Sequence, residues 1–201
     1  MCFFWWPQIR QDFVHYCRSC DKCQINNKPT TLSSGRSLTL PEPDKAYQSL
    51  AIYFAGPFNM SDSFTTIMVI MDCFTSYTYL IPLKDAATSE KVFKKLNNTI
   101  FNVHGPPLSI ILDQDSRFTS KFWSQMMKSL GIQVWMATQY HHQTNSQVED
   151  RIRTLKQLMR NYINPRQNHW SSALPVIAAA INGAPHEALG ISPYQALYGC
   201  P

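Results

Sequence analysis

The stretch LAIYFAGPFNMSDSFTTIMVIMDCFTSYTYLIPL, residues 50–83, decides the fold. It contains apolar runs rich in β-branched or aromatic residues at 50–54 and 67–71, and the turn-like residues GPFNMSDS lie between them. A further run, from Tyr77 to Leu83, follows closely. Short runs of this composition, bounded by Gly, Pro, Asn and Ser, are typical of strands joined by short turns. The stretch therefore predicts an antiparallel meander of three strands.

The residues after the meander alternate between helical and strand patterns. Apolar residues that recur at helical steps from Val148 to Tyr162 predict a long helix over about 145–163. With the meander, this order predicts a mixed α/β fold in which helices flank a five-stranded sheet. Many chemistries use such a plan, so the fold alone does not identify the function. We expect helices over about 88–103, 119–130, 145–163 and 173–181, and strands over 108–112 and 132–136.

The composition is that of a globular protein of ordinary size. Of 201 residues, 44% are hydrophobic and only 15% are charged, so the chain can bury a substantial core. No apolar run approaches the ~18 residues of a membrane span, and the opening MCFFWWPQIR lacks the pattern of a secretory signal. Three of the six cysteines cluster within 17–23 rather than spreading as a disulfide framework. We therefore expect an intracellular protein with no membrane partner.

The net charge of +5 is concentrated at the front of the chain. Residues 1–36 carry five Lys or Arg against two Asp, which leaves a surplus of only two for the remainder. A basic segment suits a polyanion such as nucleic acid, because each neutralised phosphate releases counterions. An ordinary solvated surface segment is the alternative, and charge alone favours neither interpretation.

The amino-terminal segment combines a helical pattern with closely spaced cysteines. The residues FVHYCRSCDKCQ, 13–24, predict a short helix that leads into a Cys-x-x-Cys turn at Cys20 and Cys23. The residues that follow are rich in Ser, Thr, Pro and Lys without an apolar period, which is typical of a linker. We expect an amino-terminal module over 1–28, a linker over 29–45 and the main domain over 46–201.

Two carboxylates stand where a nucleic-acid enzyme could use them. Asp113 directly follows the fourth expected strand, at the carboxyl end where open α/β sheets tend to hold ligands. Glu149 lies near the start of the long helix, where it could bind a divalent cation while bases behind it bind phosphates. The alternatives are a turn aspartate and a solvated helix face with ordinary ion pairs. The bases on this helical face are Arg153, Lys156 and Arg160.

Several stretches resemble one protein family. ILDQDSRFTSKFW and QYHHQTNSQVEDRIRTL, with 35 residues between Asp113 and Glu149, resemble the second and third members of the Asp, Asp-35-Glu triad of retroviral and LTR-retrotransposon integrases. The resemblance extends through YQSLAIYFAGPF, VIMDCFTSYTYLIPL, FNVHGPP and ISPYQALYG, so it covers nearly the whole chain. It is most similar to the Ty3/gypsy type.

The resemblance implies a fold, a chemistry and partners. The fold would be a ribonuclease H-like core that binds Mg²⁺ or Mn²⁺, with Asp113 and Glu149 as catalytic metal ligands. The reaction would process the ends of element DNA and join them to target DNA by transesterification. DNA would contact Arg153, Lys156 and Arg160. Because integrases act as multimers, a homo-oligomer is expected, in a nuclear or intracellular setting.

The first acid of the triad is missing. The family pattern xDFxGPF stands here as AIYFAGPF, which puts Tyr53 at the catalytic Asp position. A phenol, whose ordinary pKa is about 10, is a poor substitute for a carboxylate as a Mg²⁺ ligand at neutral pH. Asp72 lies where the family often has a structural Asp, and Asp115 lies in a turn, so we expect neither to restore a two-metal site. Strand transfer should be weakened or absent.

The amino-terminal cysteines resemble part of the family's His, His, Cys, Cys zinc module. Cys20 and Cys23 match its Cys pair, whereas its histidines would lie before Met1. A structural zinc site needs four ligands, and His15 and Cys17 crowd the same short segment, which cannot easily surround the ion. We therefore do not expect zinc to bind, and reduced, partly buried thiols are the alternative.

Hypotheses from different classes remain open for the function. The first is an integrase-type polynucleotidyl transferase by descent, inactivated by Tyr53. The second is a non-enzymatic nucleic-acid or protein-binding module derived from an integrase, whose binding to DNA would weaken steeply with salt and ignore Mg²⁺. An ordinary ribonuclease H would need its own set of acids around one site, and the sequence does not show such a set.

Overall fold

The computed structural model describes residues 6–19, 43–84, 87–136, 153–154, 157, 169–186 and 189–199. Within these ranges no helix is long and apolar enough to cross a membrane. The strands are β1 (Ser49–Ala55), β2 (Thr66–Asp72), β3 (Thr78–Leu83), β4 (Ser109–Leu112) and β5 (Gln133–Met136). The helices are α1 (Ile9–Ser19), α3 (Ser89–Leu96), η1 (Asn97–Phe101), α4 (Asn102–His104), α5 (Lys121–Ser129), α7 (Trp170–Gly183) and α8 (Pro193–Tyr198).

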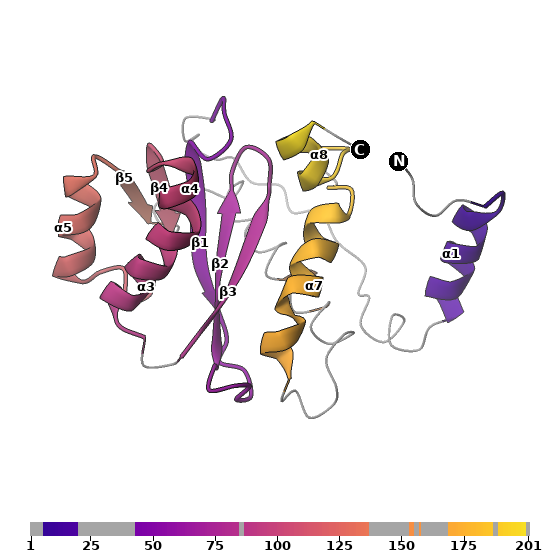
Figure 1. Cartoon of the computed structure of the whole chain (residues 1–201), viewed down its shortest axis with the longest axis horizontal. Helices are drawn as coiled ribbons and strands as arrows, with labels where there is room; N and C mark the ends of the chain where they lie inside the picture. Colours follow the sequence, from indigo (N-terminus) through magenta and orange to yellow (C-terminus); the bar gives the residue numbers. More distant parts are fainter. Residues whose placement is uncertain are drawn as a thin grey trace.

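The strands form one mixed sheet in the order β3-β2-β1-β4-β5. β1 pairs antiparallel with β2, and β2 pairs antiparallel with β3, which confirms the expected meander. β4 and β5 continue the sheet on the other side of β1 through parallel pairs. Parallel neighbours need a crossover, and α3 and α5 provide the helices of these crossovers (Figure 1). The expected five-stranded α/β fold is therefore confirmed.

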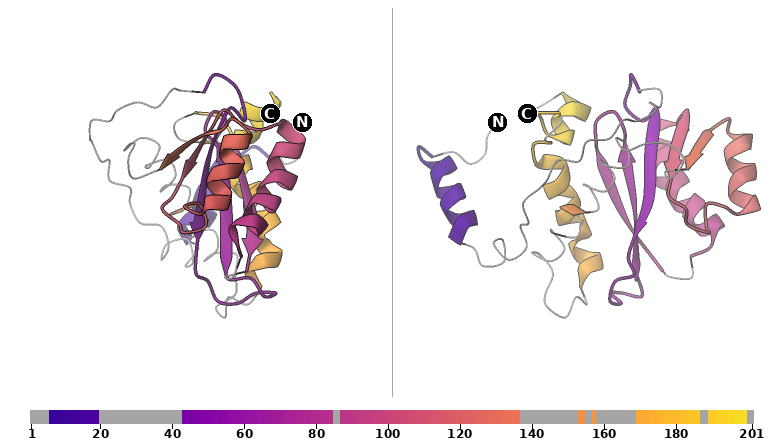
Figure 2. Two further views of the ribbon diagram at one scale, coloured as in Figure 1. Left: turned by 90° about the vertical axis from the view of Figure 1, so that its left-hand side faces the viewer. Right: turned by 180° about the vertical axis from the view of Figure 1, so that it is seen from behind.

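Successive residues of β1 belong to different cores, because neighbouring side chains of a strand face opposite sides of the sheet. Leu50 and Ile52 pack into the core that α3 and α5 cover. Tyr53 and Ala55 pack into the core that α7 covers. Figure 1 shows the sheet between these two helical layers, and Figure 2 shows the same arrangement from behind. The side chain of Tyr53 thus lies on the α7 side of the sheet.

The helix expected over 88–103 is interrupted. The α-helical part ends at Leu96, a π-helical turn occupies Asn97–Phe101, and a last helical segment continues to His104. A π turn accommodates one more residue than an α turn. It therefore shifts the helical register, and both Ile100 and Phe101 become buried although they are consecutive. An apolar period cannot reveal such a shift, because it assumes one constant helical repeat.

The other expected elements agree with the structure to within a few residues where they are described. α5 begins at Lys121, two residues later than expected, because Ser120 is the N-cap and its side chain accepts a hydrogen bond from the Trp123 backbone. α7 is longer at both ends than the expected 173–181. The helix expected over 145–163 lies largely outside the described residues. Within this range the structure describes 153–154 and 157, which are helical.

Candidate functional site

Tyr53 and Asp113 occupy neighbouring positions at the end of a parallel strand pair. Ile52 of β1 is in register with Leu112 of β4, so the next residues of the two strands are Tyr53 and Asp113. The Phe54 backbone N–H donates to Oδ2 of Asp113 at 3.0 Å, and the Asp115 N–H donates to Oδ1 at 3.3 Å. Each Asp113 oxygen thus accepts one backbone hydrogen bond and keeps further lone pairs.

The environment of Asp113 favours the protonated carboxyl more than water does. Burial raises the pKa of Asp113 above its ordinary value, while the hydrogen bonds from Phe54 and Asp115 lower it and only partly compensate. The nearby charge of Asp115 raises the pKa further, and that of Arg117 lowers it. A cation bound at this carboxylate would stabilise its ionised form, which burial alone disfavours.

Tyr53 fills an apolar space where the resemblance places an acid. Its side chain is 2% exposed and packs with Val69 of β2 and with Trp170 and Leu174 of α7. A carboxylate at this position would be surrounded by apolar side chains on the α7 side, which is costly unless a cation or donors compensate. The side chain of Tyr53 therefore packs as part of the core.

Both carboxylate oxygens of Asp115 accept hydrogen bonds from the Arg117 side chain. Arg117 Nε donates to Oδ1 and Nη2 donates to Oδ2, both at 2.7 Å. This side-chain pairing holds the pKa of Asp115 below its ordinary value. The Arg117 guanidinium also lies 3.6 Å from the centroid of the Phe54 ring, which stacks on Phe118. Asp115, Arg117, Phe54 and Phe118 form one packed group beside Asp113.

Asp72 serves the fold. Its carboxylate is buried and accepts hydrogen bonds from the Tyr47 N–H at 2.9 Å, the Thr75 N–H at 3.0 Å and the Thr75 hydroxyl at 2.6 Å. Asp72 pairs with Leu50, three residues before Tyr53 along β1, so it lies toward the other end of the strand. These contacts agree with the structural role that the sequence suggested for Asp72.

Most other candidate residues lie outside the described residues. Arg153 is described, helical and exposed. In the part of the chain that the structure describes, no group of three or more His, Cys, Asp or Glu side chains could hold a metal ion. Whether Asp113 and Glu149 meet is therefore still a prediction. The candidates without a description are Cys20, Cys23, Glu149, Lys156 and Arg160.

Sequence reasoning missed the packed group around Arg117. The segment DQDSRF does place an Arg two residues after Asp115, which is a spacing at which a turn can bring the two side chains together. Nothing in the sequence, however, indicated that Phe54 of another strand would lie under the guanidinium. Such a contact depends on the β1–β4 register, which only the assembled sheet defines.

The fold belongs to the ribonuclease H-like class. A solved structure of a simian T-cell lymphotropic virus intasome in complex with PP2A regulatory subunit B56 gamma has a similar chain, with a TM-score of 0.65. The likeness covers 95% of this chain and 67% of that chain at 20% sequence identity, so it concerns the fold alone. The mixed sheet order and the flanking helices agree with this class.

Sequence comparisons identify the family. Residues 45–142 match the integrase core domain and residues 2–29 match the integrase zinc binding domain. The chain is 31% identical over 98% of its length to the Pro-Pol polyprotein of Simian foamy virus type 3 (strain LK3). It is 25% identical over 97% of its length to the Transposon Tf2-3 polyprotein of Schizosaccharomyces pombe (strain 972 / ATCC 24843). The chain therefore belongs to the retroviral-like integrases, and it spans 17% and 15% of these two polyproteins.

The match over residues 2–29 counts against our expectation that zinc does not bind. That expectation rested on the crowding of His15, Cys17, Cys20 and Cys23 in one segment. It was drawn for that particular set of four ligands, so it does not exclude a site with other ligands. Cys20 and Cys23 can still contribute two thiolates to a site whose other ligands come from elsewhere.

Proposed function

We propose that this chain is the core of a Ty3/gypsy-type integrase, a metal-dependent polynucleotidyl transferase whose strand transfer is weakened or lost because Tyr53 replaces the first metal-binding acid. The observation that carries the proposal is the position of Tyr53 beside Asp113, packed into the apolar core under α7. Two-metal phosphoryl transfer needs several carboxylates around one site. The described residues contribute Asp113 alone, and Glu149 would be the second acid.

The protein residues at this site would bind the cation and orient its ligands. Mg²⁺ or Mn²⁺, when bound, would activate the attacking oxygen and stabilise the leaving one. The two backbone N–H groups orient the Asp113 carboxylate, and its remaining lone pairs suit a hard cation. With Tyr53 in place of an acid, such a site lacks one anionic ligand. The affinity of this site for the cation should therefore be lower than that of a site with an acid at position 53. The geometry of the reacting oxygens should also be poorly defined.

DNA is the proposed partner, bound by the basic face of the helix expected over 145–163. Arg153 is helical and exposed, and Lys156 and Arg160 follow it in sequence at helical spacing. Phosphate contacts of this kind depend on charge and are insensitive to the missing acid. We propose that the protein binds DNA in the nucleus or elsewhere inside the cell. We also propose that it forms a homo-oligomer, by analogy with the solved intasome structure.

Zinc binding belongs to the same proposal. Cys20 and Cys23 would be two of the four ligands, because the surrounding residues match the integrase zinc binding domain. Replacing both with Ser should abolish binding of one zinc ion per chain, measured by a thiolate-sensitive Co²⁺ spectrum. Full metal binding by the double variant would contradict this assignment.

The test of the enzymatic proposal is to restore the acid. We expect Tyr53→Asp to gain Mg²⁺-dependent strand transfer on oligonucleotide ends, whereas the neutral, similarly sized Tyr53→Asn should not. Both variants lose the same apolar packing, so they control for any loss of stability. Strand transfer by the unchanged chain in Mg²⁺, abolished by Asp113→Asn, would overturn the proposal that the chemistry is lost.

A cation-dependent stability measurement keeps this test informative if neither variant turns over. A cation that binds only the folded state stabilises it by mass action. Mn²⁺ should therefore raise the melting temperature of Tyr53→Asp more than that of Tyr53→Asn. Equal shifts for the two variants would show that this position does not contribute to a metal site.

A non-enzymatic DNA-binding module is the second candidate, and the packing of Tyr53 as a core residue favours it. Such a module should bind DNA with the same affinity in Mg²⁺ and in a chelator, and the affinity should fall steeply with salt. Glu149→Gln should leave this binding unchanged, while a double Ala variant of Lys156 and Arg160 should abolish it. Absence of DNA affinity at low salt would contradict this function.

A further inference from the structure

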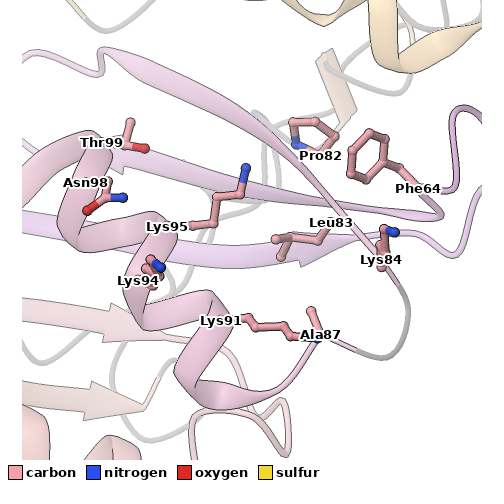
Figure 3. A pocket seen from close by; sticks show the side chains of 10 residues that line it. All are labelled: Phe64, Pro82, Leu83, Lys84, Ala87, Lys91, Lys94, Lys95, Asn98 and Thr99. Carbon is pink, nitrogen blue, oxygen red and sulfur yellow. The ribbon is translucent and has the colours of Figure 1, made fainter.

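A groove away from the candidate metal site lies between α3 and the end of β3 (Figure 3). Its volume is about 580 Å³, which is the size of a site for a small ligand or a few side chains of a partner. We call it the α3 groove. Its lining consists of Phe64, Pro82, Leu83, Lys84, Ala87, Lys91, Lys94, Lys95, Asn98 and Thr99.

Among the described residues that line the α3 groove, the charged side chains are all lysines. Lys91, Lys94 and Lys95 project from α3, and Lys84 follows β3 on the opposite side (Figure 3). All four are exposed, and none of the lining residues that the structure describes is an acid. Among described residues the ion pair is that of Arg117 with Asp115, so these lysines are not neutralised by a described carboxylate. Their mutual repulsion favours an anionic partner.

The inner surface of the α3 groove is apolar. Leu83 and Ala87 are buried, and Phe64 and Pro82 line the wall formed by the β2 and β3 side. A concave apolar surface with charges at its rim suits a partner that presents an apolar side chain between anionic ones. A phosphodiester backbone has anionic groups but no apolar group that would fill this space.

The strand edge next to the groove is unsuited to strand addition. β3 is the edge strand of the sheet, and Leu83 C=O accepts a hydrogen bond from the Thr65 N–H on the β2 side. Because backbone groups of a strand alternate in direction, the nitrogen of the preceding Pro82 faces the free edge, where it has no hydrogen to donate. Backbone pairing with a partner would therefore lack a donor at Pro82, which favours recognition through the side chains of the groove.

We propose that the α3 groove binds an acidic peptide segment of a partner protein, with one large apolar side chain over Leu83 and Ala87 and carboxylates at the lysines. Lys91 and Lys95 are one helical turn apart, so they can contact acids on both sides of the apolar residue. Lysine suits this role, because a flexible point charge accommodates carboxylates at varied positions. The proposal concerns a surface distinct from Tyr53 and Asp113.

The test uses the full chain and a defined probe. The probe is a fluorescein-labelled twelve-residue peptide in which Glu alternates with Leu and Phe, and binding is measured by fluorescence anisotropy at about 50 mM salt, where charge attraction is still felt. We expect the double variant Lys91→Glu, Lys95→Glu to weaken binding at least about tenfold. The matched control Lys121→Glu, Lys128→Glu changes the net charge equally on α5 and should bind as the unchanged chain does.

A second peptide and an oligonucleotide separate the contributions. A peptide with Ser in place of Leu and Phe should bind at least about tenfold more weakly, because the apolar surface is then unused. A single-stranded oligonucleotide of equal charge should bind without sensitivity to the groove variant. Equal loss of both probes in that variant would overturn the proposal in favour of a nucleic-acid surface.

Two further outcomes would also overturn it. One is the absence of peptide binding at low salt. The other is concentration-dependent self-association, seen by analytical ultracentrifugation, that the groove variant abolishes while the peptide does not compete. That result would assign the groove to a second copy of this chain.

Discussion

Asp72 and Asp113 are both partly or wholly buried acids at the sheet, but their surroundings differ. Asp72 is 1% exposed and accepts three hydrogen bonds, two of them at one oxygen. Asp113 accepts two, and the donor of one of these, Asp115, is itself an acid that raises its pKa. An acid that stabilises the fold has its oxygens occupied by donors. Asp113, with one donor at each oxygen, keeps more of its lone pairs available for a cation.

The largest expected effect is on the acid that serves the fold. Asp72→Ala should lower the free energy of unfolding by about 3 kcal/mol or more, because buried donors of Tyr47 and Thr75 lose a charged acceptor. Chemical denaturation measures this change. Asp72→Asn keeps one acceptor oxygen and should lose roughly half as much. A loss below about 1 kcal/mol for the Ala variant would remove the distinction between the two acids.

A smaller effect is expected at the Arg117 group, and it should depend on pH. Arg117→Ala removes the ion pair and the contact with Phe54, which should cost about 1 kcal/mol at pH 7. The pKa of Asp115 is lowered in the folded state, so its contribution is present above the unfolded pKa and is lost as pH falls through the folded pKa. Thermal melts should therefore differ at pH 7 and converge in acid. A difference that persists in acid would assign the effect to packing on Phe54 instead.

The smallest expected effect is at Asp113 and has the opposite sign. Because its pKa is raised in the folded state, the contribution of Asp113 to stability is present below the unfolded pKa and is lost as pH rises through the folded pKa. Asp113→Asn removes this charge but also loses one acceptor for a backbone N–H, and the loss of the acceptor does not depend on pH. The melting temperature of the variant relative to the unchanged chain should therefore be higher at pH 7 than below pH ~4, by a few °C at most, about what 1 kcal/mol produces in a chain of this size. A variant that compares better with the unchanged chain in acid than at pH 7 would show that the carboxylate stabilises the fold as Asp72 does.

Much of the fold could be predicted from local patterns. The meander, the β4 and β5 strands and the positions of α5 and α7 depend on apolar runs, turn residues and capping residues that neighbours in sequence reveal. The π turn at Asn97–Phe101 could not be predicted, because it results from packing two consecutive residues into one core. Exact helix starts, such as that of α5 after Ser120, depend on one capping hydrogen bond.

The candidate site was only partly predictable for a related reason. Asp113 could be placed because a strand run precedes it directly, and Tyr53 because a motif surrounds it. The packed group that contains Phe54, Arg117 and Phe118 depends on contacts between segments far apart in the chain. The α3 groove shows the same limit, since its lysines were visible in the sequence but the apolar surface that they surround came from β3.

The hydrogen bond from the Phe54 N–H to Asp113 spans 59 residues of sequence. The meander can form from local hairpins, whereas β4 reaches β1 only after the chain has crossed through α3, which is a slower, non-local closure. Exchange of the Phe54 amide proton with deuterium therefore records when the crossover has closed. Following this single proton would time the last step of sheet assembly and detect any transient detachment of β4 in the folded protein.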